Sequence, residues 1–202
     1  MLGWLKGRSL RRRTGQQLYE RIVAQARDPG LYEACGVPDT MDGRLEMVLL
    51  HTVLVLDRLQ SEGPAGQRLG QHLMEQLVAG VDDALRRIGL GDDSVAPRIK
   101  RLAGALMERT RDYKAALQPS PSGAPNDPST AAPELEAAFF EHVYGVDCTS
   151  PPPETEVAAR HLAIYTRNVR TALASMPSGN LLSGKLTFPP VATETGLLET
   201  RS

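Results

Sequence analysis

The sequence predicts an all-α fold, built as a single compact domain of five to seven helices. Aromatic residues make up only 4% of the chain, and the apolar residues are mostly Leu, Ala and Val, a composition that suits helices better than sheets. Apolar residues also recur at spacings of three and four through most of the chain, which is the period of a helix. The 202 residues are enough to bury a core without disulfides or structural metals.

The first two helices are predicted from their start signals and their apolar faces. Thr14-Gly-Gln-Gln17 has the pattern of a capping box and predicts a helix from Thr14 to about Asp28. A second helix is expected from Asp39 or Thr40 to Gln60. Its apolar residues cover most of the helix circumference, so we expect it to be the central, buried helix.

The remaining elements follow from periodicity, glycines and prolines. Gly89 is placed to end the third helix, Asp93 or Ser94 to cap the fourth, and Gly145 to stop the fifth. The third helix is expected at 65–88, the fourth is expected to end near Leu117, and the fifth and sixth are expected at 133–144 and 154–175. A strand-like GKLTF piece precedes Pro189-Pro190.

The chain divides into three predicted parts. Residues 1–13 form a basic N-terminal arm, 14–176 a helical domain, and 177–202 a tail with a short extended segment. Within the domain, 118–133 is rich in Pro and Ser and is predicted to be a flexible linker.

Charge is distributed unevenly along the chain. Residues 1–27 carry seven basic side chains and one acidic one, a net charge of +6, so the other 175 residues sum to −7 in a chain of net charge −1. A basic arm on an acidic body suggests contact with an anionic membrane surface or with the ribosome, and DNA is not expected as a partner. The residues expected to make this contact are Trp4, Lys6, Arg8, Arg11, Arg12 and Arg13.

The expected location is cytoplasmic, with peripheral contact at the inner membrane. Cys35 and Cys148 lie far apart and in no metal-binding spacing, which fits a reducing compartment. The arginines follow the short apolar stretch at the start instead of preceding it, unlike a secretory signal, and no apolar run reaches the length of a membrane span.

Catalytic signals are weak. His51 and His72 lie on neighbouring predicted helices, near Asp82 and Asp83, so a metal-dependent enzyme centred on His51 is one hypothesis. No metal-binding spacing such as HExxH is present, and a single histidine in a buried helix is more often a hydrogen-bonded core residue. We therefore expect no enzyme, no catalytic residue, no bound metal and no cofactor.

Charged residues cluster at two turns beside buried helices. Arg44 and Arg86 lie among apolar residues and near several aspartates, and a buried charge needs a partner. We expect a polar clamp that joins the turn GVPDTMDGR to the turn RRIGLGDD, or alternatively a partner-binding surface. The candidate residues are Asp39, Thr40, Arg44, His51, Asp82, Arg86 and Asp92.

The fourth predicted helix carries a second basic run. Arg98, Lys100 and Arg101 are followed by Arg109, Arg111 and Lys114, with Glu108 and Asp112 among them. The simplest interpretation is a solvated helix face with local ion pairs, and the alternative is a second anion-binding surface.

Several motifs together resemble the ubiquinol–cytochrome c chaperone family, whose members are assembly factors of the cytochrome bc1 complex. The most specific are GVPDTMDGRLEMVLLHTVLVLDRL (Gly36 to Leu59), LRRIGLGDDSV (Leu85 to Val95) and KAAL (Lys114 to Leu117). HLAIYTRN (His161 to Asn168) and NLLSGKLTF (Asn180 to Phe188) match more loosely.

The resemblance implies an all-helical fold without catalytic activity, in a bacterial member of the family. Mitochondrial members bind newly made cytochrome b near the ribosomal tunnel exit, together with a small partner subunit. Such a role calls for an apolar groove, and Met47, Met74 and Met107 are candidate adaptable contacts in it, or else core residues. The competing hypotheses are the metal-dependent enzyme and an RNA- or ribosome-binding module without a specific client.

Overall fold

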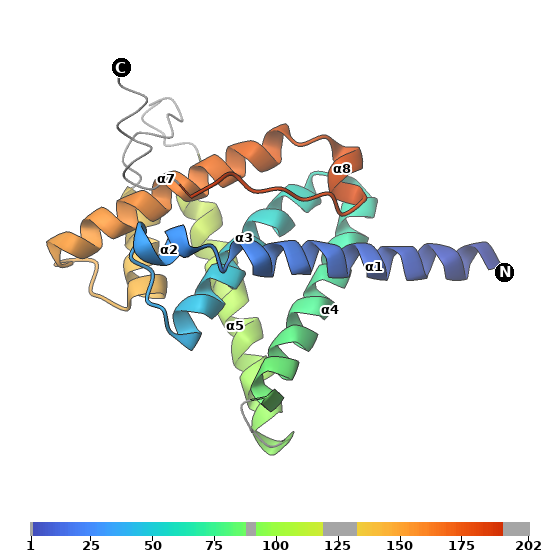
Figure 1. Cartoon of the computed structure of the whole chain (residues 1–202), viewed down its shortest axis with the longest axis horizontal. Helices are drawn as coiled ribbons and strands as arrows, with labels where there is room; N and C mark the ends of the chain where they lie inside the picture. The colour runs from blue at the N-terminus through green and yellow to red at the C-terminus, as the bar shows by residue number, and fades with distance from the viewer. Residues whose placement is uncertain (1, 88–91, 119–132, 192–202) are drawn as a thin grey trace.

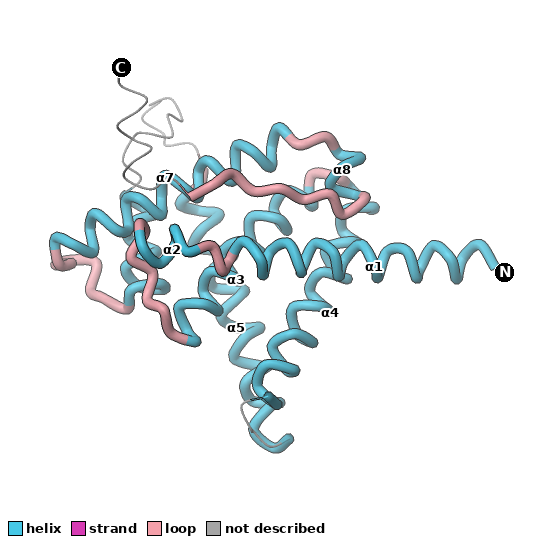
Figure 2. The backbone as a smooth tube through the Cα atoms, viewed as in Figure 1, coloured by secondary structure: helices cyan, strands magenta, loops and turns pink. Residues whose placement is uncertain are grey.

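The computed structural model describes residues 2–87, 92–118 and 133–191, with the side chains of 12–87, 97–118 and 133–191. The described residues form helices joined by short turns (Figures 1 and 2), which confirms the all-α prediction. In chain order the elements are α1 (Leu2–Gln25), α2 (Pro29–Glu33), α3 (Met41–Gln60), α4 (Gly63–Arg87), α5 (Asp92–Ala116), α6 (Pro133–Phe139), the π-helical turn η1 (Phe140–Tyr144), α7 (Pro153–Ser175) and α8 (Ser178–Leu182).

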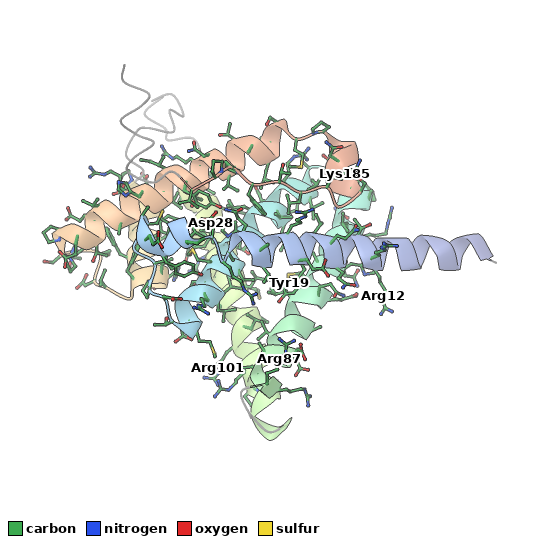
Figure 3. The ribbon with its side chains drawn as sticks, viewed as in Figure 1. Arg12, Tyr19, Asp28, Arg87, Arg101 and Lys185 are labelled. Atoms are coloured by element: carbon green, nitrogen blue, oxygen red, sulfur yellow. The ribbon has the colours of Figure 1, made fainter. Side chains whose placement is uncertain are left out.

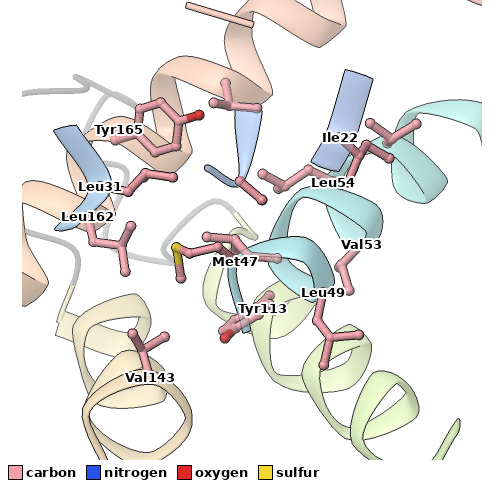
Figure 4. Close-up of a cluster of buried hydrophobic side chains, with 14 of the residues drawn as sticks. Ile22, Leu31, Met47, Leu49, Val53, Leu54, Tyr113, Val143, Leu162 and Tyr165 are labelled. Atoms are coloured by element: carbon pink, nitrogen blue, oxygen red, sulfur yellow. The ribbon is translucent and has the colours of Figure 1, made fainter. Parts of the chain in front are cut away.

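Helix α3 is the centre of the fold, as its sequence predicts. It contacts α1, α4, α5, α7 and η1. Figure 4 shows Met47, Leu49, Val53 and Leu54 pointing from α3 toward side chains of the surrounding helices. These four residues are each at most 3% exposed, so α3 is covered on nearly all sides along this stretch.

The start of α3 is fixed by a local hydrogen bond. The Thr40 hydroxyl accepts from the Gly43 N–H at 3.1 Å, so Thr40 is the N-cap. A Cβ at position 43 would lie 2.1 Å from the Pro38 carbonyl oxygen, which only glycine avoids. The turn before α3 is therefore tightly packed, and the predicted start at Asp39 or Thr40 lies within two residues of the first helical residue, Met41.

Helix α1 corrects one sequence prediction. It runs unbroken from Leu2 to Gln25, so Thr14 lies inside a helix and does not begin one. The capping pattern is overridden because the residues just before it, Leu10 to Arg13, are strong helix formers and none is a proline. The first turns of α1 extend beyond the body of the molecule (Figure 1). A functional division after residue 13 stays a prediction.

The other helix ends lie close to their predicted positions. Gly145 adopts a left-handed conformation with φ 63° and ends η1, as expected. Helix α5 begins at Asp92, one or two residues before its predicted caps. The predicted turn at Gly89 and most of the linker, 119–132, lie outside the described residues. Among the described residues the α-helices number eight, one above the expected range, because α2 and α8 are five-residue helices that periodicity does not reveal.

After a turn at 183–184, the C-terminal segment 185–191 crosses the outside of the helices without pairing as a strand (Figure 2). Leu186 and Val191 are buried in the main core, and the Phe188 ring packs edge-on against His51 with centroids 5.1 Å apart. This segment therefore closes the core over α3. None of the helices in the described ranges combines the length and the apolar character that a membrane span requires.

Candidate functional site

A pocket of about 690 Å³ opens between α1, α3 and α4. We call it the α1–α4 pocket. Its apolar floor and walls come from all three helices, and Met41, at its edge, is 59% exposed. The apolar lining residues used below are Tyr19, Val23, Leu45, Val48, Val81 and Leu85.

The shape of this pocket depends on a close approach of α1 and α4. Gly80 of α4 faces the Tyr19 ring of α1, and a Cβ at Gly80 would lie 2.0 Å from the Tyr19 hydroxyl oxygen. Glycine therefore lets the two helices meet here, and the Tyr19 ring becomes part of the pocket wall. Figure 3 shows Tyr19 on the side of α1 that faces α4, with Arg87 further along α4.

The rim of the pocket carries charges of both signs. On the α3 side, Arg44 Nε lies 2.6 Å from Asp39 Oδ1, and this hydrogen bond lowers the pKa of the Asp39 carboxyl group. On the α4 side, Arg87 pairs with Asp83. The side chains of both pairs are 58–76% exposed, so water and salt screen the attraction within each pair. Both pairs are therefore weak enough to exchange partners.

Arg27 completes the rim, just after the end of α1. Within the described part of the chain, its guanidinium has neither an ion pair nor a hydrogen bond. With three arginines and two aspartates lining the pocket, the rim has a net charge of +1.

The predicted polar residues are divided by the structure. Asp39, Thr40 and Arg44 line the α1–α4 pocket. Asp82 and Arg86 do not line it, and Arg86 Nε instead lies 3.1 Å from Asp82 Oδ2, one turn earlier on α4. The side chain of Asp92 lies outside the described side chains.

The expectation that Arg44 and Arg86 are buried is wrong, because their side chains are 61% and 51% exposed. Sequence reasoning named Asp83 only in the metal hypothesis and did not name Arg87. Both stand one residue further along α4 and so point about 100° away from Asp82 and Arg86. Their identical i, i+4 spacing was the available signal. Arg27 had no signal beyond its charge.

His51 belongs to the core. It has no exposed surface, and its Nδ1 and Nε2 lie 2.7 Å from the Met47 carbonyl oxygen and from the Tyr165 hydroxyl oxygen. Burial lowers the pKa of His51 to about 4. His72 instead contacts Glu75 at 3.0 Å on its own helix. Because both ring nitrogens of His51 already have partners, the geometry favours a structural role over metal binding or direct partner contact.

The C-terminal half of the second basic run on α5, Arg109 to Lys114, is paired with acidic side chains, two of them on the neighbouring helix α3. Arg109 pairs with Glu46 through two nitrogens, at 3.1 and 2.8 Å, and Lys114 Nζ lies 2.8 Å from Asp57. Arg111 pairs with Asp112. These contacts support the interpretation of a helix face with local ion pairs.

The predicted contacts of the N-terminal arm and the methionines are placed as follows. Arg12 and Arg13 are exposed on α1, whereas the side chains of Trp4, Lys6, Arg8 and Arg11 lie outside the described side chains. Of the methionines, Met47 is in the core, Met74 packs against it and Met107 is 74% exposed. None of the three lines the α1–α4 pocket, where Met41 stands instead.

Two comparisons identify the family. The family described as ubiquinol-cytochrome C chaperone matches residues 33–188, which is more than half of the chain. The chain belongs to the ubiquinol–cytochrome c chaperone family. It is also similar to the crystal structure of the Cbp3 homolog from Brucella abortus, with 31% sequence identity and a TM-score of 0.74 over 95% of this chain and 98% of that chain. Among curated proteins no match was found.

The segment that matches the family contains only part of the α1–α4 pocket. The pocket walls from α3 and α4 lie within residues 33–188, whereas the wall from α1, with Tyr19, Val23 and Arg27, precedes this segment. The ubiquinol–cytochrome c chaperone segment therefore supplies two walls of the pocket, and the helix that leads into it supplies the third.

Proposed function

We propose that this protein is a non-enzymatic assembly chaperone, which binds newly made cytochrome b and supports biogenesis of the ubiquinol–cytochrome c reductase (bc1) complex. The observation that carries the proposal is the family match over residues 33–188. The similarity to the Cbp3 homolog over nearly the whole of both chains supports it.

The α1–α4 pocket suits such a role. A membrane protein under assembly exposes apolar side chains, and a concave apolar surface with a charged rim can shield them from water without catalysing a reaction. Each fully buried Leu or Val side chain contributes about 1.5–3 kcal/mol. Several such side chains in the pocket would therefore hold a client firmly enough to protect it and weakly enough to release it.

The first experiment measures assembled bc1 complex in cells that lack the gene. We expect bc1 complex to fall while other respiratory complexes remain at their normal levels. Unchanged bc1 levels would reject the chaperone proposal. Equal loss of all respiratory complexes would point to a general defect and would count against it too.

The second experiment asks whether the pocket is the client site. Ala84→Trp fills the pocket from an exposed position on α4 without removing a core contact, and Ala79→Trp is the matched control at an exposed position on the same helix outside the pocket. We expect Ala79→Trp to restore bc1 assembly in the deletion strain and Ala84→Trp to fail at equal protein levels.

The basic arm is the proposed attachment point, through Trp4, Lys6, Arg8, Arg11, Arg12 and Arg13. We propose that it holds the protein at an anionic surface, either the inner membrane or the ribosome near its tunnel exit, where a small partner subunit would also act. Sedimentation with anionic vesicles or with ribosomes should fall steeply with salt, and should be lost when Arg11, Arg12 and Arg13 are replaced by Gln. Sedimentation unaffected by these changes would rule the arm out.

A further inference from the structure

We infer that the α1–α4 pocket takes a short amphipathic helix with an acidic flank, two to three turns long, and not a membrane-spanning segment. This inference rests on the proposed function, because it takes the pocket to be the site of the client. It goes further by stating what kind of segment binds.

The size of the pocket sets the length of its occupant. A cavity of about 150 Å³ is what a buried leucine leaves when it is cut back to alanine. The pocket, at about 690 Å³, therefore has room for about four such side chains. Four apolar side chains at the positions i, i+3, i+4 and i+7 occupy one face of roughly eight residues of helix, or about 12 Å. A membrane span needs about 20 apolar residues around its whole circumference.

The lining indicates an amphipathic partner. The apolar floor is bordered by ion pairs on both walls, Asp39–Arg44 beside α3 and Asp83–Arg87 on α4. A helix that is apolar on every side would place apolar surface against these charges and remove them from water, which is costly. A helix with one apolar stripe instead presents polar flanks to the two ion pairs, while its stripe lies on Val48, Val81 and Leu85.

The positive charge of the rim favours acidic residues on the polar flanks of the bound helix. The net charge of +1 comes from Arg27, which has no ionic partner among the described residues. A carboxylate on the occupant would form an ion pair with the Arg27 guanidinium without breaking an existing one. A lysine at the same place would be repelled by the like charge of Arg27. Arg27 is therefore the proposed specificity-determining residue, and the two ion pairs provide exchangeable secondary contacts.

The experiment measures binding of labelled synthetic 14-residue helical peptides to the purified full-length protein by fluorescence anisotropy. One peptide has a four-leucine stripe at the i, i+3, i+4, i+7 positions with glutamates beside it, a second has lysines in place of the glutamates, and a third has the first composition in scrambled order. We expect the acidic peptide to bind at least tenfold more tightly than the other two.

Two matched pairs of variants locate the effect. Arg27→Glu should reverse the preference toward the lysine peptide, while Arg21→Glu, the same charge change at an exposed position of α1 outside the pocket, should preserve it. Ala84→Trp should abolish binding of the acidic peptide, and Ala79→Trp should not. Equal binding of the scrambled peptide, a preference unchanged in Arg27→Glu, or binding that survives Ala84→Trp would each overturn the inference. So would tighter binding of a detergent-solubilised 20-residue leucine span that Ala84→Trp abolishes.

These outcomes separate the inference from the proposed function. If the peptides behave as expected but deletion of the gene leaves bc1 complex unchanged, the pocket chemistry stands and the bc1 client is wrong. If deletion lowers bc1 complex but the peptides show no charge preference, the function stands and the stated occupant is wrong.

Discussion

The Nε2 atom of His51 lies 2.7 Å from the hydroxyl oxygen of Tyr165, a residue 114 positions later, and this contact joins the central helix α3 to α7 inside the core. The Met47 carbonyl can only accept a hydrogen bond, so Nδ1 of His51 carries the proton and donates to it. Burial lowers the pKa of His51, so the imidazole is neutral at pH 7 and its unprotonated Nε2 accepts from the Tyr165 hydroxyl.

The first prediction concerns pH. Burial lowers the pKa of His51 from 6.5 to about 4, so the unfolded chain binds a proton at a pH where the folded one does not. The contribution of His51 to stability is complete above pH 6.5 and is lost as the pH falls from 6.5 toward 4, by about 3 kcal/mol in total. Urea unfolding across this range should show the loss, and His51→Gln should make the slope shallower. An equal pH dependence of the free energy of unfolding in the wild type and in His51→Gln would contradict the proposed role of His51. Comparing the two proteins at pH 8 measures separately how much stability the lost packing costs.

The second prediction concerns the pair between Arg109 and Glu46, whose side chains are 14% and 12% exposed. Arg109→Leu leaves the Glu46 carboxylate largely buried without its partner and should lower the free energy of unfolding by about 3 kcal/mol. Replacing both residues by Leu should recover most of the loss, because no unpaired charge then remains. The control is Arg111→Leu on the same helix, where the arginine is 74% exposed and its ion pair is screened by water, so its effect should be much smaller than that of Arg109→Leu. If the double variant loses as much free energy of unfolding as Arg109→Leu, the unpaired Glu46 carboxylate is not the cause of the loss.

The third prediction concerns the crossing of α1 and α4. In Gly80→Ala the new methyl group would overlap the Tyr19 ring, so we expect a loss of about 1–3 kcal/mol despite the better helix propensity of Ala. In a Tyr19→Ala background the same substitution should be neutral or stabilising. A double-mutant cycle by denaturant unfolding measures this coupling, and additive effects would mean that the two residues do not meet.

The fourth prediction concerns the two thiols. Cys35 is buried and Cys148 is exposed. Burial raises the pKa of Cys35 to about 12, so its reactive thiolate form is scarce at neutral pH. Ellman's reagent should modify one thiol in the native protein and two in guanidinium, and Cys148→Ser should leave none reactive without denaturant. Rapid native reaction in that variant would show that the α2 region opens readily.

The central part of the fold was predictable from the sequence because its signals are local. The apolar circumference of α3, its start near Thr40 and the stop at Gly145 each depend on residues within a few positions of one another. Thr14 also carried a local signal, but a capping pattern only permits a helix to begin. It does not end the helix that already precedes it, and α1 therefore continues through Thr14.

The candidate site was predictable only in part because it is made by the packing of helices. Asp39, Thr40 and Arg44 were chosen for their position at a turn, and they line the pocket. The choice between Asp82 and Asp83 depends on the rotation of α4 about its axis, which the close contact of Gly80 with Tyr19 helps to set. That contact joins residues 61 positions apart, and no periodicity within either helix reports it.

The continuity of α1 has a mechanical consequence. A helix of 24 residues is about 36 Å long and bends only gently. Its C-terminal half forms a wall of the α1–α4 pocket, and its first turns lie outside the body (Figure 1). A flexible tether would leave the pocket free to face any direction. On the proposed attachment of the far end of α1 to a surface, a stiff rod of fixed length would set the height and angle of the pocket above that surface.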